Sequence, residues 1–431
     1  MTPVRLGLRE NLPQFSLLVA INAFVGAMVG LERSTLPLIG KLDFGLASKA
    51  AVLSFIVAFG LAKALTNLGA GVFAQRIGRR RLLIAGWTLA LPVPILVATA
   101  PSWGWIVAAN ILLGINQGLA WSMTVVMKID LVGPRRRGLA LGLNEAAGYG
   151  GVAVAAAVSG WLAADLAARD VLAVAGAAIA VTALALSVLF VRDTAAHVAL
   201  EQGTSEPPPR LREAFPDATW RSPSLRACSQ AGLVNNLNDA LAWGLVPLLL
   251  ASHGASIGAI GLVAGIYPAF WGAGQIWTGH WSDRVGRKLP IVAGMLVQAA
   301  ALALLALSGG AVGTAAVAAA LLGIGTALVY PTLIAAISDA VAPVARAPMV
   351  GVYRFWRDMG YVAGGVLAGV VADALGFSGA IALVAALTAL SGLVVAVDLR
   401  VDQYLKPMRD VIDAQRPNLS GNAPQTVRGR A

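Results

Sequence analysis

Eight ionisable side chains interrupt the otherwise apolar stretches of this 431-residue sequence. An ionised group in the middle of a lipid bilayer costs ~2.5 kcal/mol or more unless it faces a partner or a water-filled cavity. Four of the eight are acidic and four are basic, so we expect a paired network that a proton or a charged solute can rearrange. The eight residues are Glu32, Arg33, Lys63, Glu145, Asp239, Arg354, Arg357 and Asp358.

Helical spacing groups these charges with other polar side chains, because residues three or four positions apart share one face of a helix. Arg354, Arg357, Asp358 and Tyr361 form one such stripe. We expect this stripe and similar groups on other helices to face a shared cavity that binds a solute or a coupling ion. The predicted cavity residues are Glu32, Arg33, Lys63, Asn67, Asn110, Gln117, Glu145, Tyr149, Asn235, Asn238, Asp239, Trp243, Arg354, Arg357, Asp358 and Tyr361.

Two of the charges are neighbours in the sequence. Glu32 and Arg33 point about 100 degrees apart on a helix, so each needs a partner elsewhere. A carboxylate removed from water takes up a proton more readily, which makes Glu32 and Asp239 candidate proton carriers. Glu145 and Arg354 lie 209 positions apart, and we interpret them as opposite charges that face each other across the cavity.

Other chemistries find no support in the residue types. The three histidines and the single cysteine show no ligand spacing, so we expect no metal and no other cofactor. No Ser-His-Asp, paired-carboxylate or thiol arrangement indicates an enzyme. No Gly-Lys-Ser or Gly-Lys-Thr motif predicts the nucleotide site of an ATP-driven pump. The net charge of +11 is spread over the loops, so nucleic acid is not an expected partner.

The elements that must position these charges are long apolar runs. With 58% hydrophobic residues, 12% charged residues and a mean hydropathy of +0.76, the chain belongs in a bilayer. A span needs about 20 apolar residues, and such a run satisfies its backbone in lipid by forming a helix. We therefore predict an all-α membrane protein whose twelve transmembrane helices lie near residues 15–38, 47–73, 82–101, 104–127, 138–165, 171–191, 226–252, 257–280, 289–308, 312–338, 347–373 and 376–397.

The loop that follows the second run occurs again in the second half of the chain. Other landmarks repeat at nearly the same interval, such as Asp130 and Asp339, which lie 209 positions apart. A unit of about two hundred residues is therefore duplicated, which predicts two pseudo-symmetric bundles of six helices. The two loops read Gly71-Val-Phe-Ala-Gln75-Arg76-Ile-Gly78-Arg79-Arg80 and Gly279-His-Trp-Ser-Asp283-Arg284-Val-Gly286-Arg287-Lys288.

With two six-helix halves, a basic linker and the repeated pattern Gly-x-x-x-Asp-Arg-x-Gly-Arg-Lys, the sequence resembles the major facilitator superfamily of secondary transporters over its whole length. The resemblance implies alternating access around a midplane cavity, and an inner gate in which Arg79 pairs with Asp130 and Arg287 with Asp339. It also implies that the Asp283 carboxylate faces the N-terminal end of a neighbouring helix. The alternative is that the loop arginines only set the topology. The predicted gate residues are Gly71, Gln75, Arg76, Gly78, Arg79, Asp130, Gly279, Asp283, Arg284, Gly286, Arg287, Lys288 and Asp339.

The sequence departs from the family pattern in three places. Gln75 stands where the first loop should carry an aspartate, so we expect the first half of the gate to be weaker than the second. Asn110, four residues before Gly114, stands where many proton-coupled exporters of the family carry an arginine. The Gly-Pro signature of antiporting exporters is missing from residues 147–151, so antiport by family analogy is weakened.

The basic residues also predict the topology. Most of the 32 fall in loops and tails on one side of the predicted membrane, whereas only Lys41, Lys49 and Arg169 fall in loops on the other. By the positive-inside rule, both termini lie in the cytoplasm, and we expect a bacterial cytoplasmic (inner) membrane protein. The predicted units are a bundle at 1–192, a cytoplasmic linker at 193–225, a bundle at 226–398 and a cytoplasmic tail at 399–431. The tail fits either a short surface helix or a frayed end.

We expect a proton-coupled secondary transporter for a small polar or zwitterionic organic solute. An anionic group on that solute is favoured, because guanidinium groups bind carboxylate or phosphate with two hydrogen bonds. Export of an amphipathic, drug-like compound by proton antiport is the main competing hypothesis, and a passive facilitator or a non-transporting sensor are further alternatives. The expected partners are membrane lipid, the small-molecule solute and protons, and we expect a monomer.

Overall fold

The computed structural model describes residues 4–132, 137–201, 210–341 and 345–400, and the part of the chain so described contains helices and no strand. Helices of the first half follow the predicted spans closely, because each apolar run is long enough to satisfy its own backbone. They are α1 (Leu12–Leu42), α2 (Lys49–Ile77), α3 (Arg79–Ala90), α4 (Pro92–Thr99), α5 (Trp103–Val132), α6 (Arg137–Leu162) and α7 (Ala168–Leu189).

The second half repeats this arrangement after a linker with short helices of its own. The linker contains α8 (Ala195–Glu201), α9 (Leu211–Pro216) and a π-helical turn, η2 (Asp217–Arg221). The long helices that follow are α10 (Pro223–Ser252), α11 (Ile257–Val285), α12 (Lys288–Ala306), α13 (Val312–Asp339) and α14 (Arg346–Asp398). The predicted tail at 399–431 lies almost entirely outside the described residues.

The number of helices differs from the number of membrane crossings for two reasons. Helices α3 and α4 form one bent crossing, because Pro92 has no N–H to continue the hydrogen-bond ladder of the preceding helix. Helix α14 contains two crossings, separated at Gly376, whose φ of 75° and ψ of 178° are not helical. Among the described residues, ten helices are long and apolar enough to span a membrane when α14 is counted as one, and α6 is the remaining crossing. The prediction of twelve transmembrane helices is confirmed.

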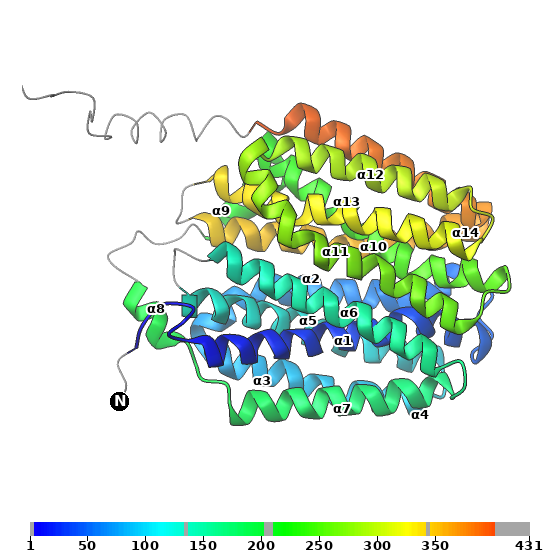
Figure 1. Ribbon diagram of the computed structural model, residues 1–431, viewed down its shortest axis with the longest axis horizontal. Coiled ribbons are helices and arrows are strands. Elements are labelled where there is room, and N and C mark those ends of the chain that lie inside the picture. Colours follow the sequence, from blue (N-terminus) through cyan, green and yellow to red (C-terminus); the bar gives the residue numbers. More distant parts are fainter. Residues whose placement is uncertain (1–3, 133–136, 202–209, 342–344, 401–431) are drawn as a thin grey trace, which may run out of the picture.

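The long helices form two bundles that lie one above the other in Figure 1. Within the first bundle α1 packs on α6 and α2 on α5, and within the second α10 packs on α14 and α12 on α13. Between the bundles, α2 packs on α14 and α6 on α11. Helices α8 and α9 lie at the same end of the molecule, on the left in Figure 1, which we call the linker face; the opposite end is the far face.

Small residues bring these cross-bundle helices close together. A Cβ added at Gly60 of α2 would lie 2.4 Å from the Cβ of Tyr361, and one added at Gly160 of α6 would lie 2.5 Å from the Cα of Gly261. Glycine permits such backbone approach between membrane helices. The two bundles therefore pack tightly along α2 with α14 and along α6 with α11.

A polar clasp joins the same bundles at the far face. The carboxylate of Asp373 in α14 accepts hydrogen bonds from the backbone N–H groups of Lys49 and Ala50, at 2.7 and 3.1 Å, and from the Ser48 hydroxyl at 2.6 Å. The Lys49 ammonium lies 3.7 Å from the same carboxylate. An anion at a helix N-terminus is favourable, so the second bundle caps the first bundle's α2.

Candidate functional site

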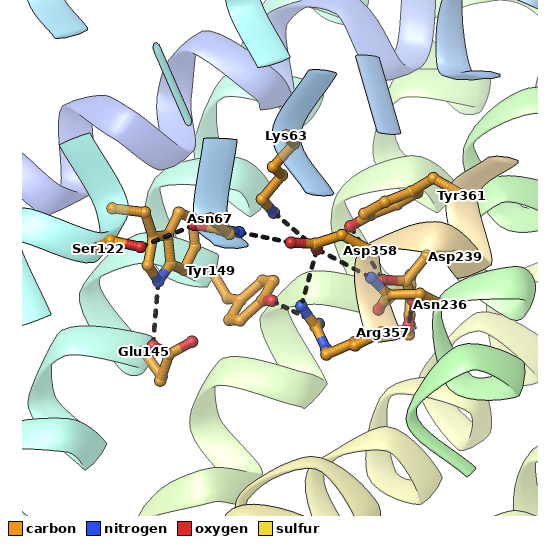
Figure 2. Close-up of polar contacts among 12 residues, drawn as sticks. Lys63, Asn67, Ser122, Glu145, Tyr149, Asn236, Asp239, Arg357, Asp358 and Tyr361 are labelled. Atoms are coloured by element: carbon orange, nitrogen blue, oxygen red, sulfur yellow. Dashed lines mark hydrogen bonds and ion pairs between the residues drawn. The ribbon is translucent and has the colours of Figure 1, made fainter. Parts of the chain in front are cut away.

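A carboxylate of α14 joins both bundles in the middle of the molecule (Figure 2). Asp358 is 1% exposed, and its Oδ2 accepts a hydrogen bond of 2.5 Å from the Asn67 side chain of α2. Its Oδ1 lies 3.5 Å from the Lys63 ammonium, also of α2, and accepts a bond of 3.5 Å from Asn236 of α10. The adjacent Arg357 guanidinium lies 3.7 Å from Oδ1. Asp358 is thus the buried counter-charge of two cations.

Aromatic rings surround the second cation of this site. The Arg357 Nη2 donates a 3.1 Å hydrogen bond to the Tyr149 hydroxyl of α6, and its guanidinium lies 4.1 Å from the ring centroid of Tyr330. Tyr149 in turn stacks on Trp271 of α11, with ring centroids 3.5 Å apart. A guanidinium over an aromatic face is attracted by the ring's quadrupole, most strongly where water is excluded. Arg357 is held in place by rings from both bundles.

Glu145 lies at the first-bundle side of this network and is only partly paired. Its Oε1 accepts hydrogen bonds of 3.0 Å from Trp121 and of 3.0 Å from Asn144. Its Oε2 is buried and has no hydrogen-bond partner among the described residues. No ion pair between Glu145 and Arg354 is described, and their facing each other across the cavity stays a prediction. Oε2 of Glu145 can therefore take up a proton or accept a hydrogen bond from a solute.

Asp239 of α10 forms a second buried centre beside the first. Hydroxyl groups of Tyr267 and Tyr361 both donate to its carboxylate, the latter at 3.3 Å. Trp243 stacks on Tyr361 with ring centroids 5.8 Å apart, and Tyr361 also contacts Phe59 of α2. Tyr361 thus connects Asp239 with the packed surface between the bundles.

Asn235 and Asn238, which were expected to share the cavity with Asp239, contact the interior of the second bundle instead. Asn238 donates to Gln298 of α12 at 2.8 Å, and Gln298 donates to Asn235 at 3.2 Å. Helix α10 packs against other helices on more than one side. Helical spacing alone therefore does not show which neighbouring helix a polar side chain contacts. The two asparagines bond within one bundle and lie away from the cavity.

The neighbours Glu32 and Arg33 diverge, as their positions on a helix require. Arg33 is 0% exposed, and its guanidinium lies 4.8 Å from the ring centroids of both Phe59 and Trp243. Glu32 lines a separate apolar pocket between α1, α4 and α7. Arg33 therefore faces the other bundle, whereas Glu32 faces the interior of its own.

Two other predicted cavity residues also bond within the first bundle. Asn110 donates to the backbone oxygen of Ile106 at 3.2 Å, and Gln117 donates to that of Val25 at 2.8 Å. Both side chains are buried among α1 and α5 neighbours. Neither lines the central cavity.

The cavity itself is small, polar and shared by the two bundles. Helical spacing did not reveal Ser122 or Tyr330, which line it, because single polar or aromatic residues in apolar runs give no periodic signal. Ser122 donates to Asn67 at 2.7 Å, so it belongs to the Asp358 network. The lining residues are Lys63, Asn67, Trp121, Ser122, Tyr149, Tyr330, Arg354, Arg357 and Asp358.

Both ion pairs expected in the gate are present at the linker face. The Nε of Arg79 lies 2.7 Å from Asp130 Oδ2, and the Nε of Arg287 lies 2.8 Å from Asp339 Oδ2. Arg287 also donates to Ser282 at 2.8 Å. Each pair forms within its own bundle, so each fixes a loop against the end of α5 or α13.

The remaining gate residues fall into two groups. Gly78 and Gly286 have φ values of 95° and 84°, which explains glycine at these positions, since other residues rarely adopt them. Arg76, Arg284 and Lys288 are exposed. The contacts of the others lie outside what the structure describes, so the expected position of the Asp283 carboxylate stays a prediction. These others are Gly71, Gln75, Gly279 and Asp283.

Comparison with known proteins agrees with this architecture. A family model described as Major Facilitator Superfamily matches residues 15–227 and, a second time, residues 228–415. Among solved structures, the chain is similar to a bacterial homolog of the human lysosomal transporter Spinster, in an inward-facing and unoccupied conformation. The TM-score is 0.70 with 14% sequence identity, over 94% of this chain and 98% of that one. At this identity the similarity shows a shared fold.

Proposed function

Because this chain belongs to the major facilitator superfamily of membrane transporters, we propose that it moves a small polar or amphipathic organic solute by alternating access, coupled to protons. The observation that carries the proposal is the polar cavity between the bundles, where Asp358 connects α2, α10 and α14. When the bundles move apart, contacts across them break, and charged groups of a solute can take their place. Binding and bundle movement are thereby coupled.

The cavity lining favours a solute with an anionic group. Lys63, Arg354 and Arg357 contribute three positive charges to this lining, against one negative charge from Asp358. A guanidinium binds carboxylate or phosphate through two parallel hydrogen bonds, and the bond strengthens where water is excluded. A carboxylate or phosphate group, with a polar remainder that fits Asn67, Ser122 and the aromatic rings, matches this lining.

Proton coupling is supported by the buried carboxylates that are not paired with a cation. Asp239 is bound by two tyrosine hydroxyl groups, and Glu145 has an unpartnered oxygen. Glu32 lines an apolar pocket, and among the described residues it forms no ion pair and its Oε2 has no hydrogen-bond partner. Such groups gain or lose a proton as their surroundings change, which is the property a coupling residue needs.

The charge distribution supports an orientation in which the linker face is cytoplasmic. The far face carries Lys41, Lys49 and Arg169, whereas most basic residues outside the helices belong to the linker side. Both termini are then cytoplasmic, and a bacterial inner membrane is the compartment that we propose. We also propose that the protein works as a monomer.

Export of an amphipathic, drug-like compound is the second candidate, and an apolar pocket in the second bundle favours it. This pocket lies between α10, α11, α12 and α13, beside the Asp239 centre, because Trp243 and Tyr267 belong to its wall. Its other lining residues are aliphatic, including Val246, Ile260 and Leu302. An apolar body could be buried there, with a polar group at Asp239.

Ligand-induced thermal stabilisation separates the two candidates. We expect carboxylates, phosphates or zwitterions to raise the melting temperature of the purified full-length protein, and Arg357→Gln to abolish that rise. Arg212→Gln, which removes an exposed arginine of the linker, is the matched control. The stabilising compound should then accumulate in proteoliposomes under an imposed proton gradient. Stabilisation only by lipophilic cations, unchanged in Arg357→Gln, would favour the exporter; absence of accumulation would overturn proton-coupled transport.

A further inference from the structure

The start of helix α3, which carries one arginine of the gate, lacks a cap of its own. Its first turn contains Arg79, Arg80 and Arg81 and no acidic residue, and the capping position is Gly78, which has no side chain to offer. The N-terminal end of a helix carries a partial positive charge, so three arginines there are unfavourable without a counter-charge. The second-half loop carries Asp283 in its sequence, whereas the first-half loop carries Gln75.

A carboxylate from the linker occupies this place. Asp193, which follows the end of α7, accepts the backbone N–H of Arg80 at 3.1 Å through Oδ2. Its other oxygen, Oδ1, accepts the N–H of Ala195 at 2.9 Å and so fixes the start of α8. A Cβ at Gly78 would lie 3.4 Å from Oδ2, which places the carboxylate directly at the beginning of α3.

The next residue of the linker binds the ion pair itself. The Thr194 hydroxyl donates a 2.6 Å hydrogen bond to Oδ2 of Asp130, the oxygen that also lies 2.7 Å from Arg79 Nε. Thr194 is 1% exposed, so this bond is shielded from competing water. The hydroxyl and the guanidinium together set the orientation of the Asp130 carboxylate.

Further bonds hold this part of the linker against the first bundle. The Arg80 guanidinium donates to the backbone oxygens of Val191 and Val188, at 2.7 and 2.6 Å. The backbone N–H of Arg192 donates to Gln14 of α1 at 3.0 Å. The two functional side chains are therefore held on a fixed backbone.

The other end of the linker is fixed to the second bundle near the cavity. Trp356, adjacent to Arg357 in α14, donates to the Thr219 hydroxyl at 2.9 Å, and Ser229 of α10 donates to the backbone oxygen of Ala218 at 2.8 Å. The linker thus contacts the gate of one bundle and a cavity helix of the other.

We propose that Asp193 and Thr194 are positioning residues of the first-bundle gate: Asp193 caps the start of α3, and Thr194 orients the Asp130 carboxylate. The linker is then a working part of the gate, in addition to connecting the bundles. The proposal rests on the proposed function, because it takes the loop that the Arg79–Asp130 pair fixes within the first bundle as part of the inner gate.

Distances between the bundles test this proposal in the full-length chain. Spin labels at Leu189 and Leu289, both exposed near the linker-face ends of α7 and α12, report the opening of that face after Cys228→Ser removes the buried native thiol. We expect Asp193→Asn and Thr194→Val to raise the population with the longer distance ~2- to 5-fold, the effect of losing one charge or hydrogen bond at a helix end. Asp130→Asn is the reference for a lost gate.

Control variants give the result its meaning. Glu213→Gln, which removes a negative charge elsewhere in the linker, should leave the distances unchanged, and Thr194→Ser, which keeps the hydroxyl, should behave as wild type. If Asp193→Asn and Thr194→Val match wild type while Asp130→Asn shifts the distances, the proposal is wrong. An unshifted Asp130→Asn variant would instead overturn the gate itself.

Discussion

At the scale of single residues, Asp358 joins α14 to α2 of the other bundle and to α10 of its own. It balances Lys63 and Arg357 and accepts hydrogen bonds from Asn67 and Asn236. Burial of ions is tolerated only when partners replace the lost water, so removal of a shared partner affects every group in contact with it. The residue serves both stability and transport, and the two roles can be separated by experiment.

Asp358→Asn should destabilise the protein and abolish transport, because two buried cations lose their counter-charge. Breaking such a pair from one side costs ~3 to 5 kcal/mol. The double variant Asp358→Asn with Lys63→Met should recover part of the melting temperature but none of the transport. Asp217→Asn, in an exposed pair with Arg221, is the control for removing an aspartate. Full transport by Asp358→Asn would contradict a central role for this residue.

The protonatable carboxylates make a separate prediction. Asp239→Asn and Glu32→Gln should each prevent accumulation driven by a proton gradient, while exchange of solute between the two sides at equal pH continues. A coupling residue fixed in its neutral form still permits the bundles to move with bound solute. Uptake and exchange in the same proteoliposomes measure both properties. Unchanged gradient-driven accumulation in one variant would exclude that residue as the proton carrier.

At the scale of helices, close packing of α2 on α14 depends on glycine. Gly60→Ala would place a methyl group 2.4 Å from the Cβ of Tyr361, too close for any real contact. The helices must then separate, which should cost ~1 to 3 kcal/mol and slow transport. Gly150→Ala in α6 is the control, since its methyl group meets open space and helix propensity favours alanine. Equal melting temperatures for the two variants would show that this contact adapts.

The helices and the gate could largely be predicted from the sequence, whereas the direction of several polar side chains could not. Apolar runs fix helix position, and the family resemblance implied the pairs of Arg79 with Asp130 and of Arg287 with Asp339. Glu32 lies on a helix with neighbours on several sides, so its spacing fits more than one partner. The contact of Asp193 with Arg80 joins residues 113 positions apart, and no motif marks such a pair. Its discovery required coordinates.

At the scale of the whole molecule, two sets of contacts hold the ends of the bundles. The far-face clasp joins one bundle to the other through Asp373, whereas the two ion pairs at the linker face stay within their own bundles. Alternating access requires that contacts across one face break when that face opens. The clasp therefore stabilises conformations with the far face closed, and the linker contributes the corresponding restraint at the other end.

Asp373→Ala should shift the molecule toward conformations that are open at the far face. Loss of a carboxylate that binds two backbone N–H groups and an ammonium removes a restraint of ~1 kcal/mol or more, enough to change the ratio of states about fivefold. Spin labels at Leu42 and Leu307, exposed at that face, should report longer distances. Asp170→Ala, an exposed acidic residue in the first turn of α7, is the control. Unchanged distances in Asp373→Ala would mean that packing alone keeps the face closed.

The residues on the two sides of the far-face clasp should differ in how well they tolerate substitution. Two of the groups that meet the carboxylate belong to the main chain, so exchanging the side chains of residues 49 and 50 leaves those donors in place, unless proline is introduced. Asp373 cannot be exchanged in this way, because its side chain is the acceptor of all three hydrogen bonds. Substitutions should therefore be tolerated at residues 49 and 50 and selected against at Asp373, and an antibody or small molecule that covers the Asp373 carboxylate should favour conformations open at the far face.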